Sequence, residues 1–239
     1  MAGLIVKLDQ VAAIRATKNQ PYPGPVAAAV LADLAGADGI AIHLREDLRT
    51  TQQKDVQILR QAVQKKFILE MAPTPEMVAF SLGLKPDLVT LVPETTKTSV
   101  GKEGMDLVLH KDKIAEAVQT LHGNRIAVCI LIDPDPDQVK LAHQANADRV
   151  ELCAEVFCRT IKTNKGKRAR SEISDTAKFA RKLKMAVDAG RGLDYSTILG
   201  FKGLRQIETF IIGYSIISRA ILTGMETATR EMAAQIRAL

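Results

Sequence analysis

Eight short segments rich in Val, Ile and Leu recur along the 239-residue chain, and this repetition constrains the fold more than any other feature. Most of them are nearly continuous apolar runs rather than alternating ones, as expected of parallel strands that are covered on both faces. The pattern therefore predicts eight buried parallel strands. They are LIVKLD (4–9), GIAIHL (39–44), KFILEM (66–71), LVTLVP (88–93), IAVCILID (126–133), RVELCA (149–154), KMAVDAG (184–190) and TFIIGY (209–214).

Segments with helical spacing separate these runs. Strand and helix alternate eight times, and the connections are too short for a second domain, so right-handed crossovers close the sheet on itself. We expect an α/β fold, a (β/α)₈ TIM barrel with additional helices, as a single domain over 1–239. A doubly wound open sheet is the alternative, but it would show a glycine-rich loop after the first strand, where 7–15 has no glycine. The expected helices lie at 26–36, 54–66, 74–83, 106–123, 135–147 and 171–184, with a short and a longer helix in 215–239.

Composition excludes several classes of protein. Apolar residues make up 46% of the chain and charged residues 25%, which is typical of a globular protein with an aliphatic core. No apolar run approaches the roughly 20 residues of a membrane span, and the N-terminal segment lacks the features of a secretory leader, so we expect a cytoplasmic protein. The three cysteines form no C-x-x-C pair, which argues against a disulfide framework and a thiolate zinc site.

The formal net charge of +6 suits a partner that is an anion. Much of this charge lies in KTNKGKRAR (162–170), which has no acidic and no aromatic residue. We interpret this segment as a solvated mobile loop that could close as a lid over bound phosphate. Nucleic-acid binding is the weaker interpretation, because no aromatic stacking platform accompanies the charges.

Polar residues follow the apolar runs at the ends where barrel enzymes carry their reacting groups. His43 is the one histidine of four that falls on a predicted strand, and Glu70 ends an apolar strand where an unpaired carboxylate would be costly. They form a plausible acid/base pair, and a ring of salt bridges that includes Glu70 and Glu151 is the structural alternative. Scattered carboxylates with one histidine do not favour a metal site. The residues at these ends are Lys7, Asp9, Gln10, His43, Arg45, Glu70, Glu94, Asp133, Glu151, Asp188, Arg191, Tyr214 and Ser215.

The loops after the last two strands have the features of a phosphate site. Gly190, Gly192 and Gly213 allow close approach of the backbone, and Ser215 can cap a following helix. Arg191, between two of these glycines, adds a cation with two donors. We therefore expect phosphorylated small molecules as substrates.

Several of these motifs together resemble the pyridoxine 5′-phosphate synthase family, over essentially the whole chain. The segment 22–49, which contains HLRED (43–47), carries most of the resemblance, and LEM (69–71), LVPE (91–94), AGRGL (189–193) and 211–225 add to it. The resemblance implies an octameric barrel that condenses deoxyxylulose 5-phosphate with 3-amino-2-oxopropyl phosphate, with no metal and no organic cofactor.

The resemblance also implies roles for individual residues. His43 and Glu70 match the proton acceptors of the family, and Glu151 matches the carboxylate that stabilises the transition state. Asp9 and Arg45 match ligand contacts, and Gly192 and Gly213 match backbone contacts to phosphate.

The sequence departs from the family pattern at several of these positions. Arg191 stands where the family has its proton-donating histidine, and arginine stays protonated near neutral pH. Another group must then donate the proton, or the step is absent. Lys7 forms either a salt bridge to Glu70 or Glu151, or a Schiff base. The other substituted positions are Gln10, Lys18, Thr50, Val100, Ala154, Glu155 and Tyr214.

Two interpretations remain. One is an enzyme of the pyridoxine 5′-phosphate synthase type with reduced or altered activity, in which Lys7, Gln10, Lys18, Arg191 and Tyr214 take part in substrate binding. The other is a catalytically silent barrel that binds a phosphorylated metabolite or a partner protein. Retention of the charged residues at the strand ends favours the first, and the arginine in the donor position favours the second.

Overall fold

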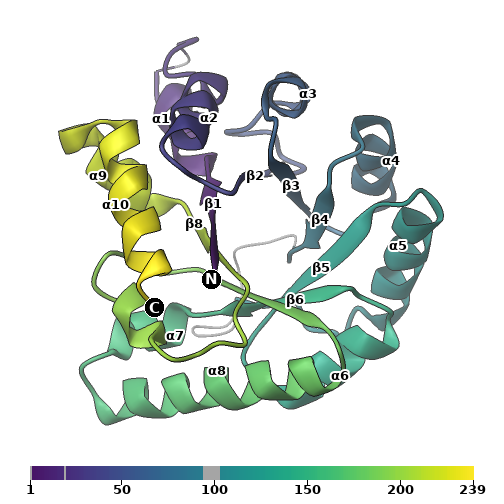
Figure 1. Ribbon diagram of the computed structural model, residues 1–239. Helices are drawn as coiled ribbons and strands as arrows, with labels where there is room; N and C mark the ends of the chain where they lie inside the picture. Colours follow the sequence, from purple (N-terminus) through teal and green to yellow (C-terminus); the bar gives the residue numbers. More distant parts are fainter. Residues whose placement is uncertain (1, 19, 94–102) are drawn as a thin grey trace.

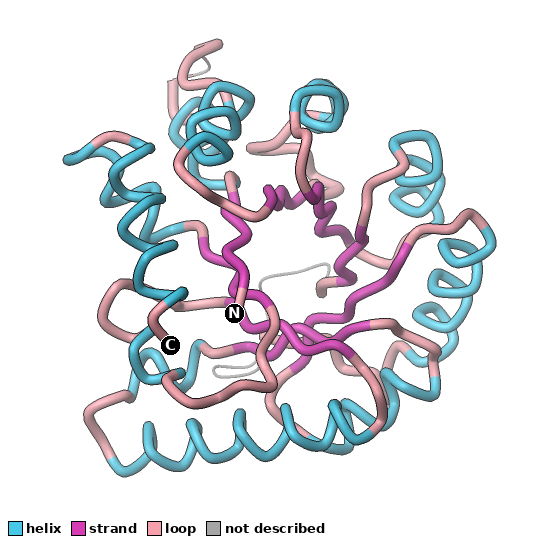
Figure 2. The backbone as a smooth tube through the Cα atoms, in the orientation of Figure 1, coloured by secondary structure: helices cyan, strands magenta, loops and turns pink. Residues whose placement is uncertain are grey.

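The computed structural model describes residues 2–18, 20–93 and 103–239. Its eight strands are parallel, and each pairs with the next until the last pairs with the first, which closes the barrel. Figure 2 shows the strands as a central ring surrounded by helices. The structure confirms the predicted fold. The strands are β1 (Gly3–Lys7), β2 (Gly39–His43), β3 (Lys66–Met71), β4 (Leu88–Leu91), β5 (Ala127–Ile132), β6 (Arg149–Cys153), β7 (Ala186–Gly190) and β8 (Thr209–Ile212).

The helices cover the outer face of the barrel (Figure 1). Many begin with the signals that the sequence carries: Thr74 and Asp135 each accept a hydrogen bond from a backbone N–H in the first turn, and a proline follows each of them. The helices are α1 (Asp9–Ala16), α2 (Pro25–Leu34), α3 (Gln53–Ala62), α4 (Pro75–Leu84), α5 (Lys111–Gly123), α6 (Pro136–Gln144), α7 (Glu155–Thr160), α8 (Asn164–Lys182), the 3₁₀ helix η1 (Ile198–Phe201), α9 (Tyr214–Thr223) and α10 (Met225–Arg237).

Both faces of the strands are buried, which explains their continuous apolar sequences. The outward side chains, such as Phe67 and Leu69, belong to the large core between strands and helices. A second, smaller cluster draws one residue from each of six strands and fills the centre of the ring. The centre is therefore packed with side chains and is not a pore. This inner cluster consists of Ile5, Ala41, Ile68, Leu88, Cys129 and Ile211.

The first strand is shorter than predicted. β1 ends at Lys7, and Asp9 and Gln10 lie in the first turn of α1, which the sequence analysis did not predict. An acidic residue is favourable there because it faces the positive end of the helix dipole. Two predicted positions, Glu94 and Val100, lie outside the described residues.

The interpretation of 162–170 as a mobile loop and lid is wrong. Most of this segment forms the first turns of α8, which Thr163 caps by accepting a hydrogen bond from the Gly166 N–H at 3.2 Å. Gly166 is buried, and a Cβ there would lie 2.1 Å from the Thr160 carbonyl oxygen. Arg170 donates to the carbonyls of Gly200 and Lys202 at 2.6 and 3.0 Å. These contacts fix the segment against its neighbours.

Within the described ranges, none of the helices combines the length and the apolar character that crossing a membrane requires.

Candidate active site

A pocket of about 610 Å³ opens at the carboxyl ends of the strands. Its walls come from the ends of β1, β7 and β8 and from the helices that follow β1, β6 and β8. Many of the polar residues predicted at these ends line it. They are Lys7, Asp9, Gln10, Arg191, Gly192, Gly213, Tyr214 and Ser215.

Lys7 is the centre of a buried charge cluster beside this pocket. Its Nζ atom forms an ion pair with Glu70 and a second with Asp9 Oδ2 at 3.0 Å. Arg191 Nη2 lies 3.6 Å from the same Glu70 oxygen. Asp9 also accepts a hydrogen bond from the backbone N–H of His43 at 2.8 Å, which ties the start of α1 to the end of β2. Lys7 thus forms the salt bridge to Glu70 that the sequence analysis weighed against a Schiff base.

His43 and Glu70 lie opposite each other on β2 and β3. Burial and the nearby Lys7 cation lower the pKa of His43 to about 4, so the imidazole is neutral at physiological pH. Burial alone would raise the pKa of Glu70, but Lys7, Arg191 and His43 outweigh it and lower that pKa to about 2. Glu70 is therefore an ionised carboxylate held between two cations.

Glu151 has the opposite character. It is 2% exposed on β6, and its side chain makes no ion pair with any described residue. Burial and the negative charge of Glu70 raise the pKa of Glu151 to about 8, so it carries a proton at neutral pH. Gly190 on β7 makes room for it: a Cβ at this position would lie 2.0 Å from Glu151 Oε1.

The loops after β7 and β8 meet at the pocket. Arg191 and Gly192 have φ angles of +66° and +71°, so the chain turns through the left-handed region directly after β7. Ser215 Oγ donates to the Leu193 carbonyl at 2.8 Å and joins the two loops. Gly213 precedes the first turn of α9, and a Cβ there would lie 2.9 Å from the Lys7 carbonyl oxygen. The N-terminus of α9 therefore begins beside the charge cluster.

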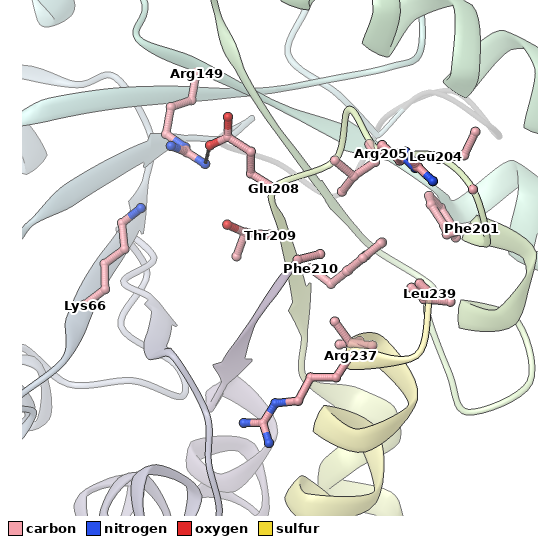
Figure 3. Close-up of a pocket in the computed structure, with 14 residues that line it drawn as sticks. Lys66, Arg149, Phe201, Leu204, Arg205, Glu208, Thr209, Phe210, Arg237 and Leu239 are labelled. Carbon is pink, nitrogen blue, oxygen red and sulfur yellow. Dashed lines mark hydrogen bonds and ion pairs between the residues drawn. The ribbon is translucent and has the colours of Figure 1, made fainter.

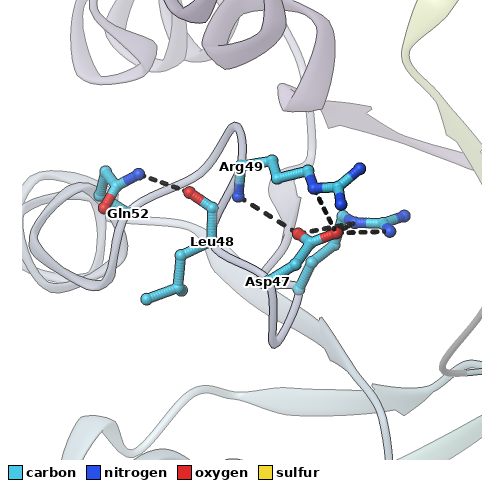
Figure 4. Close-up of polar contacts among 5 residues, drawn as sticks. Asp47, Leu48, Arg49 and Gln52 are labelled. Carbon is cyan, nitrogen blue, oxygen red and sulfur yellow. Dashed lines mark hydrogen bonds and ion pairs between the residues drawn. The ribbon is translucent and has the colours of Figure 1, made fainter.

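Arg45 and Lys18 do not line the pocket. Arg45 Nη2 is paired with Asp47 Oδ2 at 2.9 Å in the loop after β2, and Asp47 also accepts a hydrogen bond from the Arg49 N–H at 3.2 Å (Figure 4). Lys18 is exposed in the turn after α1. A contact of either residue with substrate stays a prediction.

Four polar residues of the pocket were not predicted to bind substrate or take part in catalysis: Glu103, Glu155, Asp194 and Ser218. Glu155 is the first residue of α7, and its carboxylate lies against Gly192. A Cβ at position 192 would be 2.6 Å from Glu155 Oε2. The same side chain is paired with Arg159 at 2.5 Å. Asp194 accepts hydrogen bonds from the N–H groups of Ser196 and Thr197 and so shapes the loop after β7. For Glu155, a carboxylate two residues after the end of β6 was the available signal.

The described part of the chain contains no group of three or more His, Cys, Asp or Glu side chains that could hold a metal ion.

The closed ring of eight parallel strands surrounded by helices places the protein in the class of (β/α)₈ barrels, with the pocket at the carboxyl ends of the strands. The model of the family described as "Pyridoxal phosphate biosynthesis protein PdxJ" matches residues 4–238. The chain belongs to this family.

Two curated relatives support the assignment over their full lengths. A protein of Desulfatibacillum aliphaticivorans named pyridoxine 5′-phosphate synthase is 47% identical over 237 residues, which is 99% of both chains. A protein of the same name from Desulforapulum autotrophicum is 45% identical over 239 residues and covers all of both chains.

Solved structures share the fold at low sequence identity. A 3-hexulose-6-phosphate synthase superposes with a TM-score of 0.63 at 15% identity and covers 98% of this chain and 99% of its own. Phosphoribosylanthranilate isomerase from Thermotoga maritima superposes with a TM-score of 0.62 at 10% identity and covers all of both chains. These likenesses support the barrel architecture alone.

Proposed function

We propose that the chain is a pyridoxine 5′-phosphate synthase, which condenses deoxyxylulose 5-phosphate with 3-amino-2-oxopropyl phosphate to give pyridoxine 5′-phosphate. Full-length identity to relatives of that name supports the reaction. The observation that carries the proposal is the pair of buried carboxyl groups beside Lys7 and Arg191, two residues that line the pocket: the pKa of Glu70 is lowered to about 2 and that of Glu151 is raised to about 8. Such opposed shifts are typical of groups with different roles in acid/base catalysis.

The protonation states assign these roles. Neutral His43 accepts a proton from substrate, and protonated Glu151 donates one. Ionised Glu70 holds Lys7 and Arg191 in place and balances their charge. In this assignment Glu151 replaces the proton-donating histidine that the family has at position 191, and the reaction does not need Arg191 to titrate.

Arg191 then serves phosphate binding. A permanent cation with several donors matches a phosphate group. Its neighbours in the pocket are the backbone at Gly192 and Gly213 and the N-terminus of α9, a combination that favours anions. Glu155 stands close to Gly192, and its pairing with Arg159 limits the repulsion that it would exert on phosphate.

The test is synthesis of pyridoxine 5′-phosphate from both substrates by the purified protein, followed by the absorbance of the product. We expect product from the unaltered chain and a large loss in His43→Ala and Glu70→Gln. Glu172→Gln is the matched control, because Glu172 is an exposed acid paired only with Arg168 on α8. We also expect that chelators leave the rate unchanged. No product at high protein concentration, with substrate still bound, would establish the silent barrel.

The assembly and the location of the protein belong to the same proposal. We propose a homo-oligomer, an octamer as the resemblance implies, that works in the cytoplasm. Large apolar side chains that are exposed on α2 and α9, among them Leu34 at 73% and Leu222 at 85%, support burial against other copies. Light scattering on a sizing column measures the mass. A monomeric mass at micromolar concentration would contradict the proposed assembly but not the reaction.

A further inference from the structure

A second cavity lies at the opposite end of the barrel from the mouth. Its volume is about 770 Å³, against about 610 Å³ for the mouth pocket. It is lined by Lys66, Arg149 and Thr209, which are the first residues of β3, β6 and β8. Figure 3 shows their side chains around one space, with Glu208 beside Arg149. None of these residues belongs to the site proposed for the synthase reaction.

Cations outnumber anions in this cavity. Lys66, Arg149, Arg205 and Arg237 line it, whereas Glu208 is the one acidic residue among the side chains that line it. Arg149 is already neutralised, because its guanidinium donates to both oxygens of Asp188 at 2.8 and 2.6 Å. The charge of Glu208 is shared between Arg149, at 3.3 Å, and Arg181.

The other three cations have no acidic partner among the described residues. Lys66 and Arg205 form no ion pair there, and Arg237 donates only to the carbonyl of Gly36 at 3.2 Å. Lys66 is half-buried, and burial together with the neighbouring Arg149 lowers its pKa. A cavity in which cations already repel one another stabilises a bound anion.

The rest of the cavity wall is apolar. Phe201, Ile207, Phe210 and Ile236 line it, and all four side chains are buried in the core with only their cavity faces available. Figure 3 shows Phe210 between the cationic side of the cavity and Phe201. A ligand that fills the space therefore has a charged end and an apolar body.

We propose that this cavity binds a small organic phosphate monoester, with the phosphate between Lys66, Arg149 and Thr209 and the organic part against the phenylalanines. A phosphate monoester carries close to two negative charges at neutral pH and three acceptor oxygens, which fits the Lys66 cation, which has no acidic partner among the described residues, and the neighbouring Thr209 hydroxyl group. The site is independent of the mouth and of the reaction proposed there.

The test is equilibrium dialysis with phenyl phosphate, which counts the molecules bound per chain. We expect Lys66→Gln to lose one bound molecule per chain, or to bind it at least about tenfold more weakly, relative to the unaltered protein. Lys66→Arg keeps the charge and should retain the site. Lys140→Gln is the matched control, since Lys140 is an exposed lysine on α6 with the same change of charge.

Several outcomes would overturn the proposal. Equal stoichiometry and affinity in Lys66→Gln and the unaltered protein would do so, and so would an equal loss in Lys140→Gln. If Lys66→Gln does not fold, Thr209→Ala provides the second variant, because it removes the hydroxyl group at the proposed phosphate position, and it should weaken binding in the same direction. The measured quantity is the difference in bound phenyl phosphate between proteins that share the same mouth pocket. Failure of the synthase reaction at the mouth would therefore not affect the result.

Discussion

Two buried carboxyl groups on neighbouring strands are held in different ways. Glu151 and Asp188 lie opposite each other on β6 and β7, and they are 2% and 1% exposed. Asp188 is clamped by two hydrogen bonds from Arg149, which rises from the amino end of the barrel. Glu151 has no such partner and its pKa rises to about 8. An arginine within reach therefore holds one buried acid in an ion pair, whereas the other, buried beside the Glu70 carboxylate without such a partner, carries a proton.

The largest effect on stability should come from Asp188→Asn. Removal of the charge takes away the nearer acid partner of Arg149 and leaves Glu208, at 3.3 Å, as the other, and breaking a buried pair in this way costs about 3–5 kcal/mol of the free energy of unfolding. Urea unfolding measures it. Glu172→Gln breaks an exposed pair and should change the free energy of unfolding by no more than about 1 kcal/mol. Equal changes in the free energy of unfolding for the two variants would show that the buried pair contributes no more to stability than the exposed pair.

The largest effect on activity should come from Glu151→Gln. This variant keeps the size and polarity of the side chain and removes the proton that we propose is donated, so turnover should fall by about a hundredfold to ten-thousandfold. The free energy of unfolding should stay the same or rise at neutral pH, because the carboxyl group of Glu151 must take up a proton on folding and an amide need not. Unchanged turnover would assign the donor role to another group.

The pH dependence of stability should distinguish Glu151, whose pKa is raised, from Glu70, whose pKa is lowered. The folded pKa of Glu151, about 8, lies above its unfolded value of about 4.5, so the folded chain holds more protons between these values and the free energy of unfolding falls as pH rises through this window. Glu70 acts oppositely: its pKa of about 2 gives stability that is present above pH 4.5 and is lost as pH falls toward 2. Glu151→Gln should remove this fall between pH 7 and 8, above the ordinary pKa of His43, and urea titrations at each pH would detect the change.

The smallest effect should come from Arg191→His. The pH profile of turnover should fall above about pH 8, as Glu151 loses its proton, and below about pH 4, as His43 gains one. The Arg191 cation lowers the pKa of Glu151, so its replacement should shift the alkaline limb to higher pH. The new histidine should also raise turnover modestly by supplying a second donor. An alkaline limb that does not move would mean that Arg191 does not influence Glu151.

The sequence predicted the strands well because each is apolar on both faces, and a continuous run of Val, Ile and Leu is a local signal. It failed at 162–170, where the helix is fixed by small buried residues, Gly166 and Ala169, and by the cap at Thr163. Small residues give little apolar periodicity, and the many charges concealed the helix.

The candidate site could be predicted in part. Residues at strand ends are visible in the sequence, and the pairing of Lys7 with Glu70 follows from their places on β1 and β3. The clamp between Arg149 and Asp188 joins residues 39 positions apart, and the raised pKa of Glu151 depends on the absence of such a clamp. Both depend on distances between side chains, which a single sequence does not contain.

The close contact between Gly190 and Glu151 makes the residue that is tolerated at position 190 depend on the side chain at position 151. Since a Cβ at position 190 would lie 2.0 Å from Glu151 Oε1, an alanine there would force the end of the Glu151 side chain away from its present place. In any redesigned barrel, the choice of residue at 190 therefore sets where the carboxyl group at 151 can stand.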